Sequence, residues 1–337
     1  MCTSFRMTAV DGSVCIGRSM EFPDMIGAMI TAIPRGVTFT STSPHGAGFS
    51  WTTTQGVVGM DAIGNPQYLT DGMNEAGLYA GVLYMPGFAS YEDPAGKDAT
   101  TVISNMDVCN FVLTTCTSVQ EAFARVAELT VWGQDQATIG GVPPIHLVLH
   151  DSTGDSGVIE FENGAQQHRP NPIGVATNAP YLDWHYNNLR QYMPGIHAMN
   201  PEPTAIAGVQ LAALSQGTGR MGVPGDGSSP SRFISAATYV RDVLPAANAA
   251  AQEMTVLHTL NNFDIPNGAM QGTGVGGRSQ NDQTTWVSIS SLSAKRYIVR
   301  VQTNPTPVVV DLATTDFSGD QPRQVTISDG AFTPLSL

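Results

Sequence analysis

Basic residues are scarce in this sequence, and so are charged residues of any kind. Charged side chains make up 13% of the 337 residues, the formal net charge is −13, and the lysines are Lys97 and Lys295. Nucleic acids and anionic membrane surfaces are held mainly by clustered lysine and arginine. Because the sequence has no basic run, we expect no nucleic acid and no membrane as a partner.

Long hydrophobic runs are also missing. No apolar stretch approaches the roughly 20 residues that span a bilayer as a helix, and the first residues lack the charged-then-apolar layout of a signal peptide. As the chain stands we expect it in the cytoplasm, with the periplasm as the alternative if Met1 replaces a removed signal peptide. The hydrophobic content of 42% is enough for a sizeable core, and we expect one domain over residues 1–337.

Cysteine is infrequent and lacks the spacing of a disulfide or a zinc site. Cys109 and Cys116 lie on a predicted helix, where their Cα atoms would be about 10 Å apart, too far for a disulfide. We interpret these two and Cys15 as small buried hydrophobic residues and expect no metal site. A G-x-G-x-x-G run at 217–222 lacks the preceding strand and following helix of a nucleotide-binding motif.

Hydrophobic periodicity predicts mostly strands, with a few helices. Apolar and polar residues alternate over 2–33 around Asp11-Gly12, which predicts a β-hairpin. Helical spacing predicts a helix over 101–129 with Ser118 as an N-cap. The other expected strands are 49–54, 57–62, 78–85, 145–150, 157–162, 173–176, 284–290, 296–302 and 307–311, and the other expected helices are 181–192, 231–244 and 247–261. Such blocks favour packed antiparallel sheets with helical layers.

Cys2 directly follows Met1 and precedes the small residue Thr3, a context that suits removal of the initiator methionine. Removal would leave a thiol and a free α-amine on one residue. Their unperturbed pKa values are about 8.5 for the thiol and about 7.7–8.0 for the amine. The amine can therefore accept the thiol's proton without any histidine. Position alone favours an incidental cysteine over a nucleophile.

Several sequence blocks, taken together and in order, carry a family resemblance. They are CTSFRM, GSVCIGRSMEF and VTFTSTSPHGAGFSWTTTQGVVGMDAIG near the start, then DGMNEAGL (71–78), VLYMPGFASY (82–91), VATNAPYLDWHYNNLRQY (175–192), GVPGDGSSPSRF (222–233) and NDQTTWVSISSLSAKRYIVR (281–300). The ordered set resembles the choloylglycine hydrolase family, which includes conjugated bile salt hydrolases and penicillin V acylases. This resemblance implies an α+β N-terminal-nucleophile hydrolase fold, an αββα sandwich of two antiparallel sheets flanked by helices.

The resemblance also implies catalytic roles. Cys2 matches the nucleophile, and Arg18 matches the arginine beside it, where a guanidinium favours thiolate over thiol. Asn178 matches the asparagine whose side-chain amide donates to the oxyanion. Tyr84 matches the position whose backbone N–H is the other oxyanion donor. Taken singly, such residues also fit ordinary structural roles.

Two charged residues complete the set that the resemblance implies. Arg232 matches the second arginine of the site, which orders the charged network around the nucleophile. Glu21 stands where the better-known members carry an aspartate that contacts the α-amine of the nucleophile. Its extra methylene moves the carboxylate by roughly 1.5 Å, and a displacement of that size can change a rate.

For the substrate, the resemblance implies a small-molecule linear amide and no cofactor. Tyr84 resembles the aromatic residue of penicillin V acylases, where bile salt hydrolases tend to carry asparagine, so we favour penicillin V acylase-like chemistry. Conjugated bile salts and N-acyl homoserine lactones are the alternatives. An apolar acyl pocket is expected from the following residues: Met20, Phe22, Met25, Ile26, Leu83, Met85 and Phe88.

A long excursion at 194–229, rich in glycine and proline, resembles the segment through which family members assemble as tetramers. It predicts a homo-oligomer, either a tetramer or a dimer. Two other classes of function stay open: a catalytically silent acyl-ligand-binding relative, which Glu21 makes conceivable, and an interaction protein that keeps only the fold. A retained Met1 would favour either, since it blocks the amine that the chemistry needs.

Overall fold

The computed structural model describes residues 1–274, 277 and 279–332. Its first antiparallel sheet has seven strands in the order β14-β1-β2-β18-β19-β20, with β17 paired to β18. The bounds of its strands are β1 (Cys2–Thr8), β2 (Val14–Phe22), β14 (Val175–Thr177), β17 (Met270–Thr273), β18 (Ser279–Ser291), β19 (Arg296–Val301) and β20 (Val308–Asp311).

The second antiparallel sheet has eight strands in the order β13-β12-β11-β8-β7-β6-β3-β21. The bounds of its strands are β3 (Ile30–Ile33), β6 (Val57–Ala62), β7 (Asn65–Asn74), β8 (Leu78–Tyr84), β11 (Ile145–Asp151), β12 (Ser156–Glu162), β13 (Ala165–Pro170) and β21 (Arg323–Val325). Three small ribbons lie outside the sheets: β4 (Thr38–Ser43) with β5 (Gly46–Thr52), β9 (Val102–Ser104) with β10 (Thr130–Trp132), and β15 (Thr204–Ile206) with β16 (Val209–Leu211).

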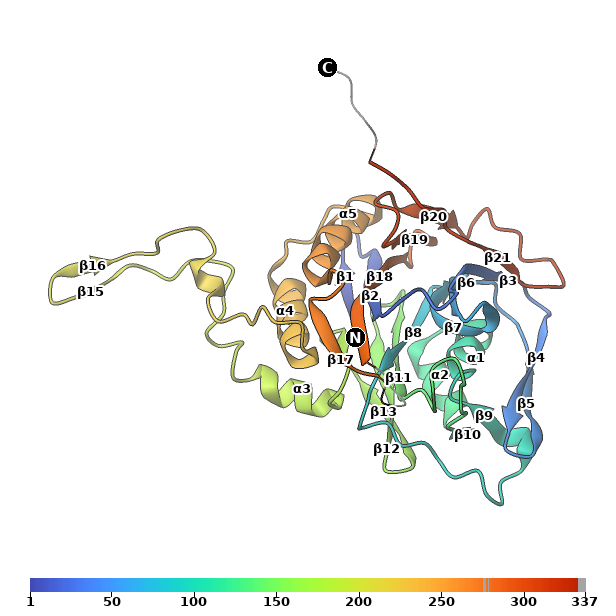
Figure 1. Cartoon of the computed structure of the whole chain (residues 1–337). Coiled ribbons are helices and arrows are strands. Elements are labelled where there is room, and N and C mark those ends of the chain that lie inside the picture. The colour runs from blue at the N-terminus through green and yellow to red at the C-terminus, as the bar shows by residue number, and fades with distance from the viewer. Residues whose placement is uncertain (275–276, 278, 333–337) are drawn as a thin grey trace.

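Helices cover the outer face of each sheet (Figure 1). Helices α4 (Ser229–Asp242) and α5 (Ala249–Leu260) pack on the first sheet, with α3 (Leu182–Leu189) against α4, while α1 (Val108–Thr115) and α2 (Val119–Val126) pack on the second. One hydrophobic core fills the space between the sheets, joining Trp286 of the first to Met60 of the second. A further core, which includes Phe111, lies under α1 and α2. This arrangement confirms the expected αββα sandwich.

The N-terminal hairpin forms around Asp11-Gly12 as predicted and sets the geometry of the site, but it ends at Phe22, because Ile30–Ile33 forms β3 of the second sheet. Gly12 adopts a positive φ of 86° in the turn, a conformation that favours glycine. In the register of β1 and β2, Cys2 lies opposite Met20, and Arg18 comes two residues before Met20 in β2. Because side chains alternate along a strand, residues 18 and 20 face the second sheet, while Ser19 faces α4.

The helix predicted over 101–129 is wrong in its extent, because the strand β9 and two separate helices, α1 and α2, occupy most of this range. Val102 and Ile103 are β-branched and favour extended backbone, and they form β9, which pairs with β10. The side-chain amide of Asn74 donates to two carbonyls at the end of α1 and so helps to end that helix. Ser118 then caps α2 through its Oγ, which accepts from the Glu121 backbone N–H at 3.2 Å, so the predicted N-cap is confirmed.

The excursion at 194–229 carries the β15–β16 hairpin, which extends away from the two sheets (Figure 1). Several of its apolar side chains are exposed: Met199, Ile206, Val209, Leu211, Leu214 and Met221. Within it, a 3-10 turn at Thr218–Arg220 occupies the G-x-G-x-x-G run. The four cysteines are free and buried, as expected for Cys15, Cys109 and Cys116. No helix in the described part of the chain is long and apolar enough to cross a membrane.

Candidate active site

The Cys2 thiol lies at the start of β1 and is 2% exposed. Its Sγ is 3.6 Å from Met20 Sδ and 3.9 Å from Arg18 Nη2. The same Nη2 donates to the Val82 carbonyl at 3.0 Å, which holds the guanidinium in place. A cation at this position favours the thiolate over the thiol.

A second buried charge balances Arg18. The Asp71 carboxylate on β7 lies 3.6 Å from Arg18 Nη1, and both side chains are fully buried. Asp71 also accepts hydrogen bonds from the hydroxyls of Tyr297, at 2.8 Å, and Ser288. Burial by itself lowers the pKa of Arg18, but Asp71, followed by the Cys2 thiol, outweighs burial and raises it. The guanidinium therefore stays charged, held by a residue that we had not predicted as part of the site.

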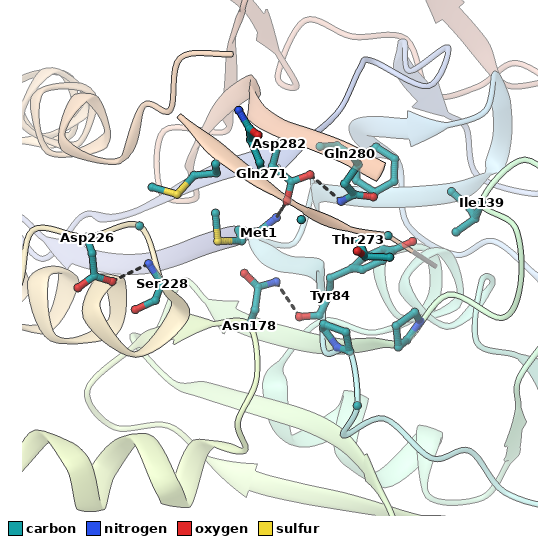
Figure 2. Close-up of a pocket in the computed structure, with 18 of the residues that line it drawn as sticks. Met1, Tyr84, Ile139, Asn178, Asp226, Ser228, Gln271, Thr273, Gln280 and Asp282 are labelled. Carbon is teal, nitrogen blue, oxygen red and sulfur yellow. Dashed lines mark hydrogen bonds and ion pairs between the residues drawn. The ribbon is translucent and has the colours of Figure 1, made fainter. Parts of the chain in front are cut away.

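Asn178 links Cys2 to the second sheet. It follows β14, which pairs with β1, and its Oδ1 accepts from the Cys2 backbone nitrogen at 2.5 Å. Its Nδ2 donates to the Tyr84 carbonyl at 2.6 Å (Figure 2). His185 Nε2 lies 3.1 Å from the Asn178 carbonyl oxygen, and burial lowers the pKa of His185 to about 4, so the ring is neutral at pH 7. The structure thus brings together Cys2, Asn178 and Tyr84.

Glu21 and Arg232 lie on the other face of β2. Arg232 of α4 pairs with Glu21 Oε2 at 2.9 Å and donates to the hydroxyls of Thr3 at 2.7 Å and Ser19 at 2.8 Å. The other Glu21 oxygen accepts from Thr284 Oγ1 at 3.1 Å. The two charges therefore compensate each other beneath the strand pair that holds Cys2, and the Glu21 carboxylate is engaged there.

Met1 precedes Cys2 and lies at the mouth of the site. Its ammonium donates to the Glu21 carbonyl oxygen at 2.8 Å and to Asp282 Oδ2 at 3.2 Å. Figure 2 shows it between Asp282 on one side and the Asn178–Tyr84 hydrogen bond on the other. The position that a free Cys2 amine would occupy is therefore an amide nitrogen here.

Two cavities meet at this point. A small one of about 50 Å³ has an almost wholly apolar lining that includes Cys2, Val82 and Met106. A larger one of about 750 Å³ lies in front of Met1 and is lined by residues of β17 and β18, by Asn178, and by the loop before α4. Phe22 and Tyr84 line both cavities, and their rings meet edge to face with centroids 5.7 Å apart. This pair separates the two spaces.

The expected acyl-pocket residues divide into two groups. Met20, Phe22 and Ile26 line the small cavity together with Cys2. The others do not occur among the described residues that line either cavity: Met25, Leu83, Met85 and Phe88. Alternation along β8 explains one case, because Leu83 points into the core between the sheets while its neighbour Val82 lines the cavity.

The remaining exceptions have equally simple packing reasons. Met85 is fully buried, and Met25 packs against the inter-sheet core. Phe88 is 38% exposed and packs edge to face on Tyr181. Ile139, which lines both cavities, was not predicted because it lies in an irregular loop with no periodic signal.

Comparison with known proteins shows which family the chain resembles. The sequence model described as "Linear amide C-N hydrolases, choloylglycine hydrolase family" matches residues 2–327. The chain belongs to this family. The resemblance inferred from the sequence blocks is thereby confirmed.

Individual members of the choloylglycine hydrolase family show the same similarity. A bile salt hydrolase/transferase of Clostridium perfringens is 30% identical over 331 residues, covering 95% of each chain. A crystal structure of a mutant conjugated bile acid hydrolase from the same organism superposes with a TM-score of 0.86 and 26% identity over 100% of both chains. A penicillin V acylase of Pectobacterium atrosepticum is 28% identical over 206 residues, which are 58% of this chain and 47% of that protein.

Proposed function

We propose that the protein, once Met1 is removed, hydrolyses small-molecule linear amides with Cys2 as the nucleophile. The observation that carries this proposal is the placement of the Cys2 thiol beside the buried Arg18 guanidinium, with Asn178 at the Cys2 nitrogen. Nucleophile, charge and amide donor thus converge at the wall between two cavities. Membership of a linear amide hydrolase family agrees with this chemistry.

The reaction runs in two steps. The Cys2 α-amine takes the thiol proton, the sulfur attacks the amide carbonyl, and the C–N bond breaks as the amine passes that proton to the leaving nitrogen. Water then hydrolyses the thioester to release the acid and restore the thiol. An asparagine amide has two N–H donors, so Asn178 can keep one on the Tyr84 carbonyl and direct the other, with the Tyr84 backbone N–H, at the oxyanion.

Glu21 and Arg232 act in this proposal as positioning residues. Their ion pair lies under β1 and β2 and ties α4 to both strands through Thr3 and Ser19. A fixed pair of strands keeps the Cys2 nitrogen aligned with Asn178. The longer side chain of Glu21 is accommodated because its partner is an arginine on the neighbouring helix.

For the acyl half, a penicillin V acylase-like preference has physical support. The cavity that contains Cys2 is small and apolar, which favours a flat aromatic or short alkyl group over a steroid. The Tyr84 hydroxyl is buried and has no hydrogen-bond partner in the described structure, so it is available to an ether or carbonyl oxygen of the substrate. The bile salt hydrolase/transferase from Clostridium perfringens matches more of the chain than the penicillin V acylase does, so a bile salt belongs in the test.

The test is intact mass of the purified protein together with hydrolysis of penicillin V, glycocholate and a long-chain N-acyl homoserine lactone. Cys2→Ala removes the thiol while keeping a small second residue, and Cys15→Ala is the matched control at another buried cysteine. We expect loss of Met1 and amine release that Cys2→Ala abolishes and Cys15→Ala retains. Activity that persists in Cys2→Ala would refute the proposed mechanism. Loss of Met1 with no turnover of any substrate would favour an acyl-ligand-binding role.

We also propose that the excursion at 194–229 mediates a homo-oligomer. The β15–β16 hairpin carries exposed Ile206, Val209 and Leu211 on a segment that extends from the two sheets. Light scattering after size exclusion should give a dimer or tetramer for the wild type and a monomer once these three residues are changed to serine. A monomeric wild type would contradict this assignment.

A further inference from the structure

Two buried histidines hold the peptide groups on either side of Asn178. His146 Nε2 lies 3.0 Å from the Thr177 carbonyl oxygen, and His185 Nε2 lies 3.1 Å from the carbonyl oxygen of Asn178 itself. A carbonyl oxygen can only accept, so each ring carries a proton on Nε2 and donates it. Because peptide groups are planar, two such contacts fix the direction in which the Asn178 side chain leaves the backbone.

The two histidines come from different layers of the fold. His146 lies on β11 of the second sheet, whereas His185 lies on α3, and both side chains are 2% exposed. The strand β14, which ends one residue before Asn178, is at the edge of the first sheet with β1 as its neighbour. Asn178 is therefore tied to both sheets and to a helix.

A buried carboxylate lies behind both histidines. Glu160 Oε1 on β12 accepts from the backbone N–H of Leu182, the first residue of α3, at 2.8 Å, and lies 3.8 Å from His146 Nδ1. The N-cap residue Tyr181 makes no side-chain cap hydrogen bond, so Glu160 supplies the acceptor and the negative charge that a helix start favours. Arg169 Nη1 donates to its other oxygen at 2.6 Å. Glu160 thus fixes the start of the helix that carries the second histidine.

The His185 ring is held in one orientation. It stacks on Phe233 of α4 with centroids 4.6 Å apart and an interplanar angle of 9°. Burial lowers the pKa of His185 to about 4, so the ring is neutral and its donation does not change around pH 7. In the described part of the chain, Nδ1 of His185 and Nδ1 of His146 have no hydrogen-bond partner. The hydrogen bonds of both rings are therefore made through Nε2, at the end of β14.

The position of the Asn178 side chain matters for the proposed reaction. Its Oδ1 is at the Cys2 nitrogen and its Nδ2 is on the Tyr84 carbonyl (Figure 2). Groups of a catalytic site have to stay within about 0.5 Å of their productive positions, and a misplacement of about 1 Å can cost about 10²-fold in rate. A buried carbonyl that loses its donor is costly to leave unpaired. The peptide would turn towards another partner and move the amide with it.

We propose that His146 and His185, supported by Glu160, are positioning residues that set the oxyanion donor Asn178 through its backbone. Neither histidine lines the described part of either cavity, so they act on the reaction only through Asn178. This assignment rests on the function proposed above, in which Asn178 stabilises the oxyanion.

The test separates the donor from the ring. His185→Phe removes the N–H and keeps an aromatic ring against Phe233, whereas His185→Gln keeps an N–H donor. On a Cys2-dependent substrate, His185→Phe should lower kcat about 10–100-fold, with KM changed less than about twofold. His185→Gln should recover most of this loss. The control is His168→Phe, since His168 packs on Phe123 at 5.2 Å and lies outside both cavities; it should keep the wild-type kcat.

A double-mutant cycle distinguishes positioning from general damage. In an Asn178→Ala background the amide is already gone, so His185→Phe should lower kcat no further. An equal loss in both backgrounds, a change mainly in KM, or a wild-type kcat in His185→Phe would overturn the proposal. If His185→Phe does not fold, as judged by urea unfolding, the same cycle is run with His146→Leu and its donor-keeping partner His146→Gln.

Failure of the proposed function gives a different result. If the wild type cleaves no amide, the positioning is still measured by NMR, as exchange of the Asn178 side-chain amide hydrogens with water. The signal is assigned by its loss in Asn178→Ala. Faster exchange in His185→Phe, with wild-type exchange in His185→Gln and His168→Phe, supports the proposal. Unchanged exchange in His185→Phe overturns it whether or not any substrate is cleaved.

Discussion

Replacing Asp71 by asparagine should destabilise the protein strongly, because it leaves the Arg18 charge buried between the two sheets. Both side chains are fully buried, 3.6 Å apart, and removing one partner of such a pair costs about 3–5 kcal/mol. Asparagine can still accept from the Tyr297 and Ser288 hydroxyls, so we expect the lower end, about 3 kcal/mol. Since whole-domain stabilities are about 5–15 kcal/mol, the urea midpoint should fall markedly with an unchanged slope.

The control for this prediction is Asp61→Asn. Asp61 is also fully buried and accepts from Thr31 Oγ1 at 2.6 Å and from the side-chain amide of Gln324 at 2.5 Å, but no ion pair of Asp61 occurs among the described residues. Its replacement should cost about 1 kcal/mol. The double variant Arg18→Met, Asp71→Asn should recover much of the loss, since it removes both charges. A cost for Asp71→Asn no larger than for Asp61→Asn would refute the reasoning.

Other predictions test the amide donor, a buried histidine and a helix cap. Asn178→Ala should lower kcat about 10²–10³-fold on a Cys2-dependent substrate with a smaller change in KM; a change mainly in KM would contradict an oxyanion role. Burial, together with Arg6, lowers the pKa of His150 to about 3. The unfolded chain therefore binds its proton first between about pH 6.5 and 3, and stability falls as pH falls through that window. Urea unfolding at several pH values should show that the unfolding free energy of His150→Gln depends less on pH than that of the wild type. An unchanged pH dependence would mean that His150 is not its source. Ser118→Ala should cost about 1 kcal/mol of unfolding free energy and Ser118→Asp only a few tenths; equal effects would mean that the cap contributes little.

Local patterns in the sequence predicted the elements that local physics controls. The Asp11-Gly12 turn and the Ser118 cap depend on neighbouring residues, and both appear where expected. The prediction of one helix over 101–129 was wrong because the end of α1 depends in part on Asn74. Asn74 lies at the end of β7, well before α1 in the chain, and it contacts the helix only in the folded protein. Periodicity carries no record of such long-range partners.

The candidate site shows the same division. Sequence blocks pointed to Cys2, Arg18 and Asn178, which converge. Asp71 and Asp282 were not predicted as site residues, although both lie inside matched blocks. The residues next to a carboxylate in the sequence do not show which distant cation it pairs with in the fold. The pocket residues were predicted from hydrophobicity alone. Had the alternation of side chains along β8 been applied, the prediction would have named Val82 instead of Leu83 as a pocket residue.

The alternation along β2 has a consequence for how this chain can change by mutation. Residues 18 and 20 contact the Cys2 thiol, and residues 19 and 21 contact Arg232 of α4. One inserted or deleted residue would exchange the two sets, so that each layer would face the wrong side chains. Insertions in β2 should therefore abolish activity even in variants that still fold. New specificities are more accessible in the loops that line the cavities, such as the one around Ile139, where length can vary without turning a strand over.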